Sequence, residues 1–317
     1  MLRIDFLLAK PFLKWAGGKT KIIDDIYKFM ISKPLGLNWS IGETGRYIEP
    51  FAGSSAAYLG LKKKGIINPQ RAILADTNEV LIVSQSTVAN PKLVESVISQ
   101  LRDMEENFKK NKKEFYYTRR QYLNEQIIPN PEKNAIDTAA NMIFINKTCF
   151  NGLWRINSKG GFNTPLGRPS SGEVTILDEE NLRLFSSSVK GVDFLCQDWR
   201  VTISNSNYGD LMYVDPPYLP LSDDEYVFSD YSGVGFSNKE HQELAIACAE
   251  AAARGVRVII SNNYSIKIEK MYRKAANECG ARIAKTRKIR LKRTMKTVSE
   301  EKRESVDEIL IFMAAKK

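Results

Sequence analysis

The sequence has 317 residues, enough for one large domain or two smaller ones. Hydrophobic residues make up 43% and charged residues 26%, so the composition favours a packed core and excludes an intrinsically disordered chain. With 47 Lys and Arg against 37 Asp and Glu, the formal net charge is +10, which makes nucleic acid the first polyanionic partner to consider.

Cysteine and histidine are too sparse and too scattered for most metal and disulfide sites. Cys149, Cys196, Cys248 and Cys279 include no C-x-x-C pair, and His241 is the single histidine. We therefore expect no metal site and no disulfide framework, which suits a reducing cytoplasm.

The apolar runs of the sequence are short. The run at 6–9 is too short for the core of a signal peptide, and the run at 309–315 is far below the roughly 18 residues of a membrane span. We therefore expect a cytoplasmic protein without a membrane partner.

Short apolar runs that alternate with helical patterns predict a sheet. The expected strands cover residues 46–50, 72–75, 192–196, 211–214 and 256–261, and a helix is expected over 56–64. This alternation is typical of a parallel, doubly wound α/β sheet, in which functional residues follow the carboxyl ends of the strands. A basic stretch at 285–293 and an apolar run at 306–313 predict a late hairpin at the sheet edge.

The middle of the chain has a different pattern. Residues 91–108, 114–126 and 134–146 predict three helices, and residues 147–175 are rich in Gly, Asn, Ser and Pro. We expect an inserted helical unit at 82–172, between two segments, 1–81 and 173–317, of one catalytic domain.

The sequence Asp215-Pro216-Pro217-Tyr218 follows an expected strand. The prolines stiffen the turn and carry no amide hydrogen. Asp215 and the carbonyl of Pro216 can each accept one hydrogen of an exocyclic amine, such as the N6 amino group of adenine, and Tyr218 offers a flat face to the ring. We predict that Asp215, Pro216 and Tyr218 are catalytic; a rigid turn that only ends a strand is the alternative.

A second strand–turn–helix pattern covers residues 47–56 and contains the small-residue turn from Phe51 to Ser55. Such a turn lets a ligand approach the backbone, although the full G-x-G-x-x-G of dinucleotide sites is absent. Asp76 ends the next expected strand, 23 residues after Gly53, a spacing that suits ribose hydroxyls. An ordinary turn and a helix-capping aspartate are the alternatives.

Residues 11–20 end in Gly-Lys-Thr, as a phosphate-binding P-loop does, but Leu13 stands where that motif requires glycine. A P-loop ATPase is therefore the second choice. Alternatively, Lys19 pairs with the carboxylate and Trp15 with the sulfonium of a zwitterionic ligand. A capped helix entry with Trp15 in the core is the structural alternative.

The loop at 150–165 mixes Arg, Lys, Asn and aromatic residues. Arginine can pair with a guanine edge and asparagine with adenine, so the loop is a candidate for reading DNA. A solvated loop without a partner is the alternative.

Together these motifs resemble those of the Dam-type DNA adenine-N6 methyltransferases. The resemblance covers nearly the whole chain and rests on residues 12–19, 48–53, 74–78, 150–167, 215–222 and 306–310. It implies a Rossmann-like S-adenosylmethionine-dependent methyltransferase sheet with an edge hairpin and an inserted helical DNA-recognition domain. It also implies adenine in GATC of double-stranded DNA as the target, in a bacterial or phage-type enzyme.

The resemblance also implies S-adenosylmethionine as methyl donor, S-adenosylhomocysteine as product and a set of binding residues. Arg155 matches the guanine-reading arginine of the family, and Lys14 a lysine near the DNA just outside the site. The predicted cofactor-binding residues are Trp15, Gly17, Lys19, Phe51, Gly53, Asp76, Asp198 and Asp215. The predicted DNA-binding residues are Lys14, Asn151, Leu153, Arg155, Asn157 and Pro165.

Hydrogen bonds at Asp215 and Pro216 are expected to favour a tetrahedral amine for direct in-line transfer, and a stacked adenine would first have to flip out. Two departures from the family pattern stand out. Ser55 replaces a glycine and is expected to add a side chain near the cofactor, and the segment 292–305 is unusually long and charged. A methyltransferase acting on RNA or on a protein amide and a DNA-binding protein without catalysis stay open as alternatives.

Overall fold

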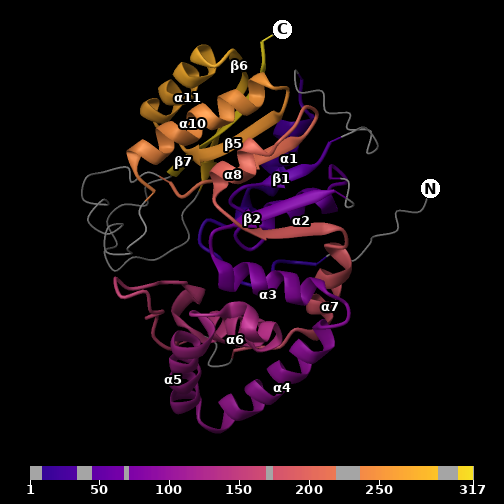
Figure 1. Ribbon diagram of the computed structural model, residues 1–317, viewed down its shortest axis with the longest axis vertical. Coiled ribbons are helices and arrows are strands. Elements are labelled where there is room, and N and C mark those ends of the chain that lie inside the picture. The colour runs from indigo at the N-terminus through magenta and orange to yellow at the C-terminus, as the bar shows by residue number, and fades with distance from the viewer. Residues whose placement is uncertain are drawn as a thin grey trace, which may run out of the picture.

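The computed structural model describes residues 9–33, 45–67, 71–168, 174–218, 236–291 and 306–316. They contain a seven-stranded sheet with the order β3-β2-β1-β4-β5-β7-β6 (Figure 1). Its strands are β1 (Tyr47–Glu49), β2 (Ala72–Asp76), β3 (Val192–Cys196), β4 (Leu211–Val214), β5 (Arg257–Asn263), β6 (Ala281–Leu291) and β7 (Val306–Ala315). Strands β1 to β5 pair in parallel, whereas β7 is antiparallel to β5 and β6. The predicted α/β fold with an edge hairpin is confirmed.

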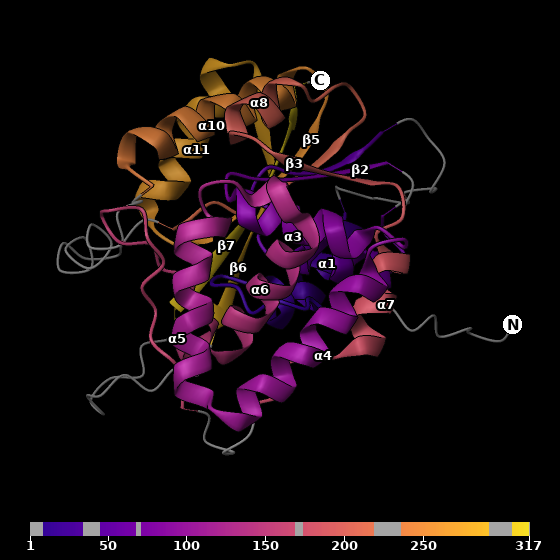
Figure 2. The ribbon, with the colours of Figure 1, turned by 60° about the horizontal axis from the view of Figure 1, so that its bottom comes forward.

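Helices cover both faces of the sheet (Figures 1 and 2). On one face lie α8 (Trp199–Ser204), α10 (Asn238–Ala253) and α11 (Ile266–Glu278); on the other lie α1 (Ile23–Ile31), α2 (Ala56–Lys63), α3 (Glu79–Ala89) and α7 (Glu179–Ser188). Along β4, Leu211 and Tyr213 join the core on the α3 side, and Met212 and Val214 join the core on the α10 side. Because both faces are covered, β4 is apolar along its whole length.

The helical unit contains α4 (Val94–Lys110), α5 (Lys112–Tyr122) and α6 (Ala135–Thr148), which lie beyond α3 as seen from the sheet (Figure 2). The three predicted helices are present with shifted ends. The one expected at 114–126 begins at Lys112, since the Asn111 side chain caps it, and continues past Tyr122 as the π-helical turn η2 (Leu123–Ile127). Short turns η3 (Pro131–Asn134) and η4 (Phe150–Gly152) flank α6.

The helical unit shares one core with the sheet. The expected boundary at residue 82 falls inside α3, whose buried Leu81 and Val88 belong to the same apolar cluster as Leu101 of α4 and Leu74 of β2. The unit therefore remains a proposed DNA-recognition domain by function, packed against the sheet rather than tethered to it.

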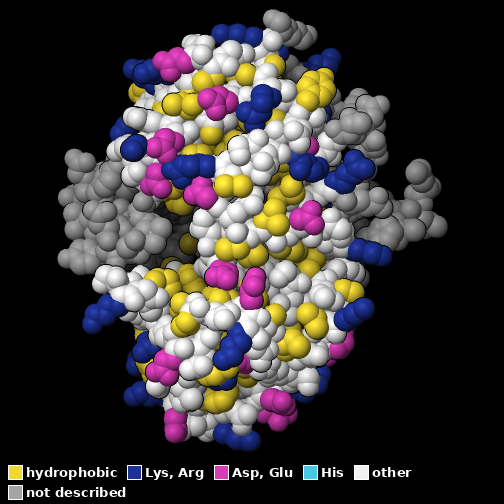
Figure 3. All heavy atoms as spheres, viewed as in Figure 1, with side chains coloured by type: hydrophobic (Ala, Val, Ile, Leu, Met, Phe, Trp, Pro, Cys, Tyr) yellow, Lys and Arg dark blue, Asp and Glu magenta, His cyan; other side chains and the backbone are white. Residues whose placement is uncertain are grey.

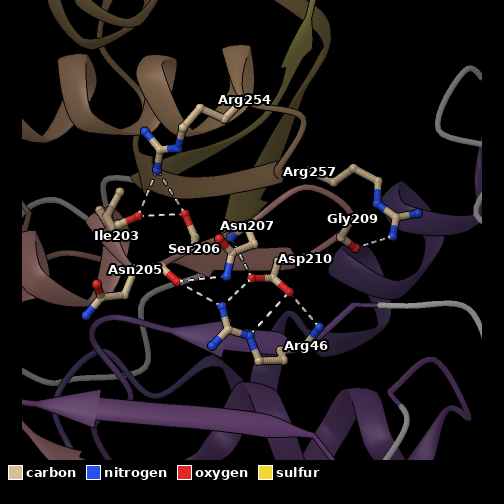
Figure 4. A network of polar contacts seen from close by, with 9 residues as sticks. All are labelled: Arg46, Ile203, Asn205, Ser206, Asn207, Gly209, Asp210, Arg254 and Arg257. Atoms are coloured by element: carbon tan, nitrogen blue, oxygen red, sulfur yellow. Dashed lines mark hydrogen bonds and ion pairs between the residues drawn. The ribbon is translucent and has the colours of Figure 1, made fainter.

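A polar network fastens the amino ends of β1, β4 and β5 (Figure 4). Asp210, directly before β4, accepts hydrogen bonds from the backbone N–H of Arg46 at 2.7 Å, from its guanidinium at 2.8 Å and from the N–H of Asn207 at 2.9 Å. Arg257 donates to the carbonyl of Gly209 at 2.8 Å. These bonds fix the start of three neighbouring strands and thereby the direction in which their other ends point.

The strand order reverses between β1 and β4, because the chain runs outward through β2 and β3 on one side and through β5 on the other. Glu49 ends β1, and Asp215 follows β4 at the same edge. In open α/β sheets, ligands bind outside the carboxyl ends of the strands at such a reversal. Two segments that carried sequence motifs, 219–222 and 292–305, lie outside the described residues.

Candidate active site

A cavity of about 740 Å³ opens at the carboxyl ends of β1 and β4. The turns after β1, β2 and β4 line it, together with residues 15–19 and with Trp154 from the helical unit. Figure 3 shows the surface hollowed between the part that carries α10 and the part that carries α5. The cavity therefore occupies the place that the strand reversal offers to a ligand.

Asp215 is the charged centre of the cavity wall. Its carboxylate accepts hydrogen bonds from Ser261 Oγ at 2.7 Å and from the Tyr218 hydroxyl at 3.2 Å, and it pairs with Lys19 Nζ at 2.8 Å. Tyr213 donates to Ser261 at 3.0 Å and so orients that hydroxyl. A carboxylate offers about four acceptor positions, so these three donors from the described residues leave about one position for a ligand.

All three predicted catalytic residues lie at this corner. Pro216 is buried and lines the cavity beside Asp215, and Tyr218 does so from the end of the same rigid turn. Proline fixes the backbone and has no N–H, which leaves the chain's carbonyl oxygens as the polar groups of the turn. The catalytic roles of Asp215, Pro216 and Tyr218 stay predictions.

Lys19 lies in the short 3₁₀ turn η1 (Lys19–Lys21) with only 4% of its surface exposed. Its ammonium group donates to the carbonyl of Gly17 at 2.9 Å and stands 4.8 Å from the centre of the Tyr218 ring. A P-loop lysine follows a strand and a phosphate-binding loop, whereas residues 9–18 contain no strand and Lys19 pairs across the sheet edge with Asp215. This geometry disfavours the ATPase alternative.

Glu49, the last residue of β1, is a second carboxyl group on the cavity wall, with 2% of its surface exposed. It accepts a hydrogen bond from the Tyr47 hydroxyl at 2.5 Å. Burial raises the pKa of Glu49 to about 8; the Tyr47 hydrogen bond lowers it, and the charge of Asp215 raises it. We did not select Glu49 from the sequence, although its place at a strand's carboxyl end was an available signal.

Asp76, the last residue of β2, and Gly53, in the turn after β1, form the next wall. Asp76 accepts hydrogen bonds from the N–H groups of Gly53 and Asn78, both at 3.0 Å. Burial raises the pKa of Asp76, and these amide donors lower it. Gly53 has φ +49°, and a Cβ there would stand 2.8 Å from the Trp15 ring, so glycine is required on both counts.

Aromatic rings form a further wall. The rings of Phe51 and Trp199 are stacked with centroids 6.2 Å apart, and Phe236 lies edge-on to Phe51 at 5.8 Å. Asp198 borders the cavity as the N-cap of α8, and its carboxylate also pairs with Arg200 at 3.2 Å. Flat apolar surfaces beside carboxyl groups suit a nucleoside.

Two polar residues near this edge do not line the cavity. Ser55 is fully buried with φ +60°, and its hydroxyl has no hydrogen-bond partner among the described residues. Ser55 itself does not line the cavity, although its neighbours Ser54 and Ala56 do, so its expected place near the cofactor stays a prediction. His241 is fully buried in α10 against Phe236, and burial lowers its pKa to about 4.

The predicted DNA-reading loop folds into a small hairpin, in which Ile156 pairs with Phe162. Arg155 is exposed, and its Nε donates to Asn163 Oδ1 at 2.6 Å, which fixes the plane of the guanidinium. Asn157 also has a structural role: its Oδ1 accepts from two backbone N–H groups of its own turn, at 2.9 and 3.0 Å, and its contact with DNA stays a prediction. Its side chain thus shapes the turn that carries Arg155.

The other predicted DNA-binding residues lie on the surface of the same region. Leu153 is 41% exposed, Pro165 and Lys14 are exposed, and Asn151 is exposed with φ +54°. Their positions are compatible with DNA contact, and the contacts themselves stay predictions.

Three further residues at the site escaped the sequence analysis. Ser261 reaches Asp215 from β5, and Trp154 lines the cavity from the helical unit. Glu308 of β7 is 8% exposed, and its Oε2 has no hydrogen-bond partner within the described ranges. Burial raises the pKa of Glu308, and the charge of Lys19 opposes that rise. Only the three-dimensional pairing of β4, β5 and β7 brings Ser261 and Glu308 toward Asp215.

Membrane-spanning helices and clusters of metal-binding side chains are absent from the described residues. None of their helices combines the length and apolarity that crossing a membrane requires. None of their His, Cys, Asp and Glu side chains form a group of three or more suited to a metal ion.

Comparison with known proteins gives the family. A family model described as D12 class N6 adenine-specific DNA methyltransferase matches residues 15–293. The chain is 32% identical over 309 residues to the Type II methyltransferase M.MjaIII of Methanocaldococcus jannaschii, covering 96% of this chain and 99% of that protein. It is 30% identical over 312 residues to the DNA adenine methylase of Haemophilus influenzae, covering 98% and 96%.

The DNA adenine methylase of Vibrio cholerae is 30% identical over 267 residues, covering 84% of this chain and 86% of that protein. The family model spans the helical unit and strands β1 to β6, and the matching residues include every wall of the cavity up to Glu240. The methyl donor of this class of enzyme is S-adenosylmethionine, and its substrate is DNA. The chain belongs to the D12 class of N6 adenine-specific DNA methyltransferases.

Proposed function

We propose that this enzyme methylates the N6 amino group of adenine within GATC in double-stranded DNA, after the base has flipped out of the helix. The proposal rests first on the corner formed by Asp215 and Pro216. There a carboxylate with about one acceptor position left lies beside a rigid proline turn, in a cavity walled by aromatic rings.

The cavity residues suit S-adenosylmethionine along its whole length. Asp76, which accepts from the N–H of Gly53, would hold ribose hydroxyls, and the stacked rings of Phe51 and Trp199 would border the adenine. Trp15 would face the sulfonium, and the turn at Lys19 the carboxylate. When bound, this donor supplies an electrophilic methyl group.

The protein's own part is to prepare the amine. The lone pair of N6 is delocalised into the purine ring, which makes the nitrogen a weak nucleophile. Hydrogen bonds from its two hydrogens to Asp215 and to the Pro216 carbonyl favour a tetrahedral nitrogen with a localised lone pair. Lys19 and Ser261 hold the Asp215 carboxylate in place for this task.

Base flipping follows from the position of the corner. Asp215 has 17% of its side-chain surface exposed and lies inside the cavity, where an adenine stacked in a duplex cannot reach it. Extruding the base costs a few kcal/mol, and stacking on the Tyr218 ring offsets part of that cost. A cytoplasmic location of the bacterial or phage type belongs to the same proposal, because both DNA and donor are found there.

The GATC target is supported by the exposed Arg155, whose guanidinium Asn163 holds in one plane. A fixed guanidinium can form two hydrogen bonds to the edge of guanine, worth about 1–3 kcal/mol of discrimination. Arg155 and Leu153 project from the same exposed side of the loop.

The experiment is a radiolabelled methyl-transfer assay on duplexes that contain GATC or one altered base pair of it. We expect transfer to GATC and transfer at least tenfold slower to each altered site. Arg155→Ala should relax the discrimination at one base pair by about 1–3 kcal/mol, whereas Lys159→Ala, which removes an exposed cation of the same loop, should weaken all sequences alike. Equal wild-type rates on every duplex would contradict the GATC proposal.

A further inference from the structure

Trp154 points the opposite way from its two neighbours. The backbone of Leu153 is extended, and Ile156 pairs with Phe162, so successive side chains alternate between the two sides of this segment. Leu153 and Arg155 are exposed, whereas Trp154 is half-buried and lines the cavity. One short segment thus presents two side chains to DNA and one to the donor site.

Trp154 continues a packed row of rings that runs into the donor site. Its ring is stacked on Trp15, with centroids 6.4 Å apart and an interplanar angle of 28°. On its other side it packs against Phe162 at 5.0 Å. Trp15 in turn lies against Gly53, where even a Cβ would stand 2.8 Å from the indole. The row therefore links the loop that carries Arg155 to the turn after β1, in which the N–H of Gly53 donates to Asp76.

The backbone under this row is clamped by a buried asparagine. Asn146 of α6, 2% exposed, accepts from the Lys14 N–H and donates to the Lys14 carbonyl, both at 2.8 Å, and it donates to the Gly152 carbonyl at 3.1 Å. Gly152 is so close to Lys14 that a Cβ would stand 2.6 Å from the lysine's own Cβ. The segments that carry Trp15 and Trp154 are thus held at a fixed separation.

We propose that Trp154 is a positioning residue that couples occupancy of the donor site to DNA reading by Arg155. A donor in the cavity restricts the Trp15–Trp154 stack, and because Trp154 and Arg155 are adjacent in the chain, the restricted ring fixes the backbone from which Arg155 projects. This inference rests on the proposed function and adds a residue that acts between the two sites. Linkage then requires that DNA strengthen donor binding by the same factor as donor strengthens DNA binding.

The test measures, with the full-length protein, the factor by which a ligand in the donor site changes the affinity for DNA. The dissociation constant for a GATC duplex is measured by fluorescence anisotropy without S-adenosylhomocysteine and with that product at saturation for each variant. The ratio of the two constants is the coupling factor. For the wild type we expect a factor of at least about five, the lower end of typical couplings.

Trp154→Ala should bring the factor close to one, and Trp154→Phe, which keeps a smaller ring, should give an intermediate value. Trp199→Phe is the matched control: Trp199 also lines the cavity and stacks on Phe51, but it lies away from the loop, so this variant should bind the product more weakly and keep the wild-type factor once saturated. A residue that only packed the core would lower stability and leave the factor unchanged.

A wild-type factor in Trp154→Ala, or an equal loss in Trp199→Phe, would overturn the inference. If Trp154→Ala does not fold, as thermal unfolding would reveal, Trp154→Phe decides: a reduced factor supports the coupling and an unchanged one refutes it. A wild type that methylates GATC but has a factor of one refutes this inference alone. A wild type that transfers no methyl group to adenine refutes the proposed function, whatever its factor.

Discussion

Strand β4 has an aspartate at each end, and the two are built differently. Asp210, before the strand, is 3% exposed and accepts four hydrogen bonds, three from Arg46 and one from the backbone of Asn207. Asp215, after the strand, accepts from three donors of the described residues and borders the cavity. A carboxylate has about four acceptor positions, so Asp210 is saturated and Asp215 has about one left.

The difference shows that the amino edge of the sheet stabilises the fold, whereas the carboxyl edge carries the groups available to a ligand. At the amino edge, two of the four donors to Asp210 are backbone N–H groups, so its carboxylate acts as part of the fold. At the carboxyl edge, the donors to Asp215 are side chains from three separate segments, which leaves the group oriented but incomplete. A group held in place with an unused acceptor position is prepared to bind a donor from a ligand.

Removing the incomplete carboxylate has the largest expected effect. Asp215→Ala should lower single-turnover methyl transfer to a GATC duplex at least about a hundredfold, because the amine loses its charged acceptor. The variant should still fold, with a lowered melting temperature because the buried Lys19 loses its ion-pair partner. Turnover above about a hundredth of the wild-type rate in a folded variant would remove Asp215 from the chemistry.

Removing the saturated carboxylate, that of Asp210, should lower stability and leave the rate of methyl transfer nearly unchanged. Asp210→Ala leaves two backbone N–H groups and a guanidinium without their acceptor, which should cost about 3 kcal/mol of stability. Chemical denaturation measures this loss, and the folded fraction should methylate DNA at nearly the wild-type rate. Wild-type stability in this variant would contradict the structural role of the amino-edge network.

Glu49, at the carboxyl edge of the sheet, should make the folding stability depend on pH. Burial raises its pKa in the folded protein to about 8 from an ordinary value of 4.5, so the folded state binds the proton more tightly than the unfolded state. Stability from this group is complete below about pH 4.5 and declines as the pH rises to about 8. Glu49→Gln should therefore reduce the loss of stability over this range, by on the order of 2 kcal/mol. Parallel pH curves for the two proteins would show that Glu49 titrates normally.

The smallest expected effect concerns the hydroxyl that orients Asp215. Ser261→Ala removes one hydrogen bond to a charged group, worth roughly 1.4 kcal/mol, and should slow methyl transfer about tenfold with little change in donor affinity. Tyr213→Phe, which leaves Ser261 in place but without its own donor, should have a weaker effect. If both variants react at the wild-type rate, Lys19 alone suffices to hold the carboxylate.

The sequence predicted which residues lie at the carboxyl ends of the strands, but it did not predict which side chains of neighbouring strands contact them. Asp76 and Asp215 follow apolar runs, and the carboxyl ends of parallel strands meet at one edge, so their convergence could be expected. Ser261 of β5 reaches the same place, but a serine within a strand carries no signal of its own. Its role depends on the pairing of β4 with β5, which places its hydroxyl at 2.7 Å from Asp215.

The direction of side chains was the second feature that the sequence could not predict. Trp154 and Arg155 are adjacent in a loop of mixed composition, and sequence alone does not say which of them faces inward. The clamp of Asn146 on Lys14 and Gly152 decides this, and it joins residues more than 130 positions apart. At Ser55 the family pattern did not show that the position is fully buried with a left-handed backbone.

The most direct measurement is a crystal structure of the enzyme with a GATC duplex and S-adenosylhomocysteine. The account predicts one adenine outside the helix, with its N6 within about 3.2 Å of both an Asp215 carboxylate oxygen and the Pro216 carbonyl oxygen. An adenine that stays stacked in the duplex, or a flipped base whose amine points away from Asp215, would contradict it.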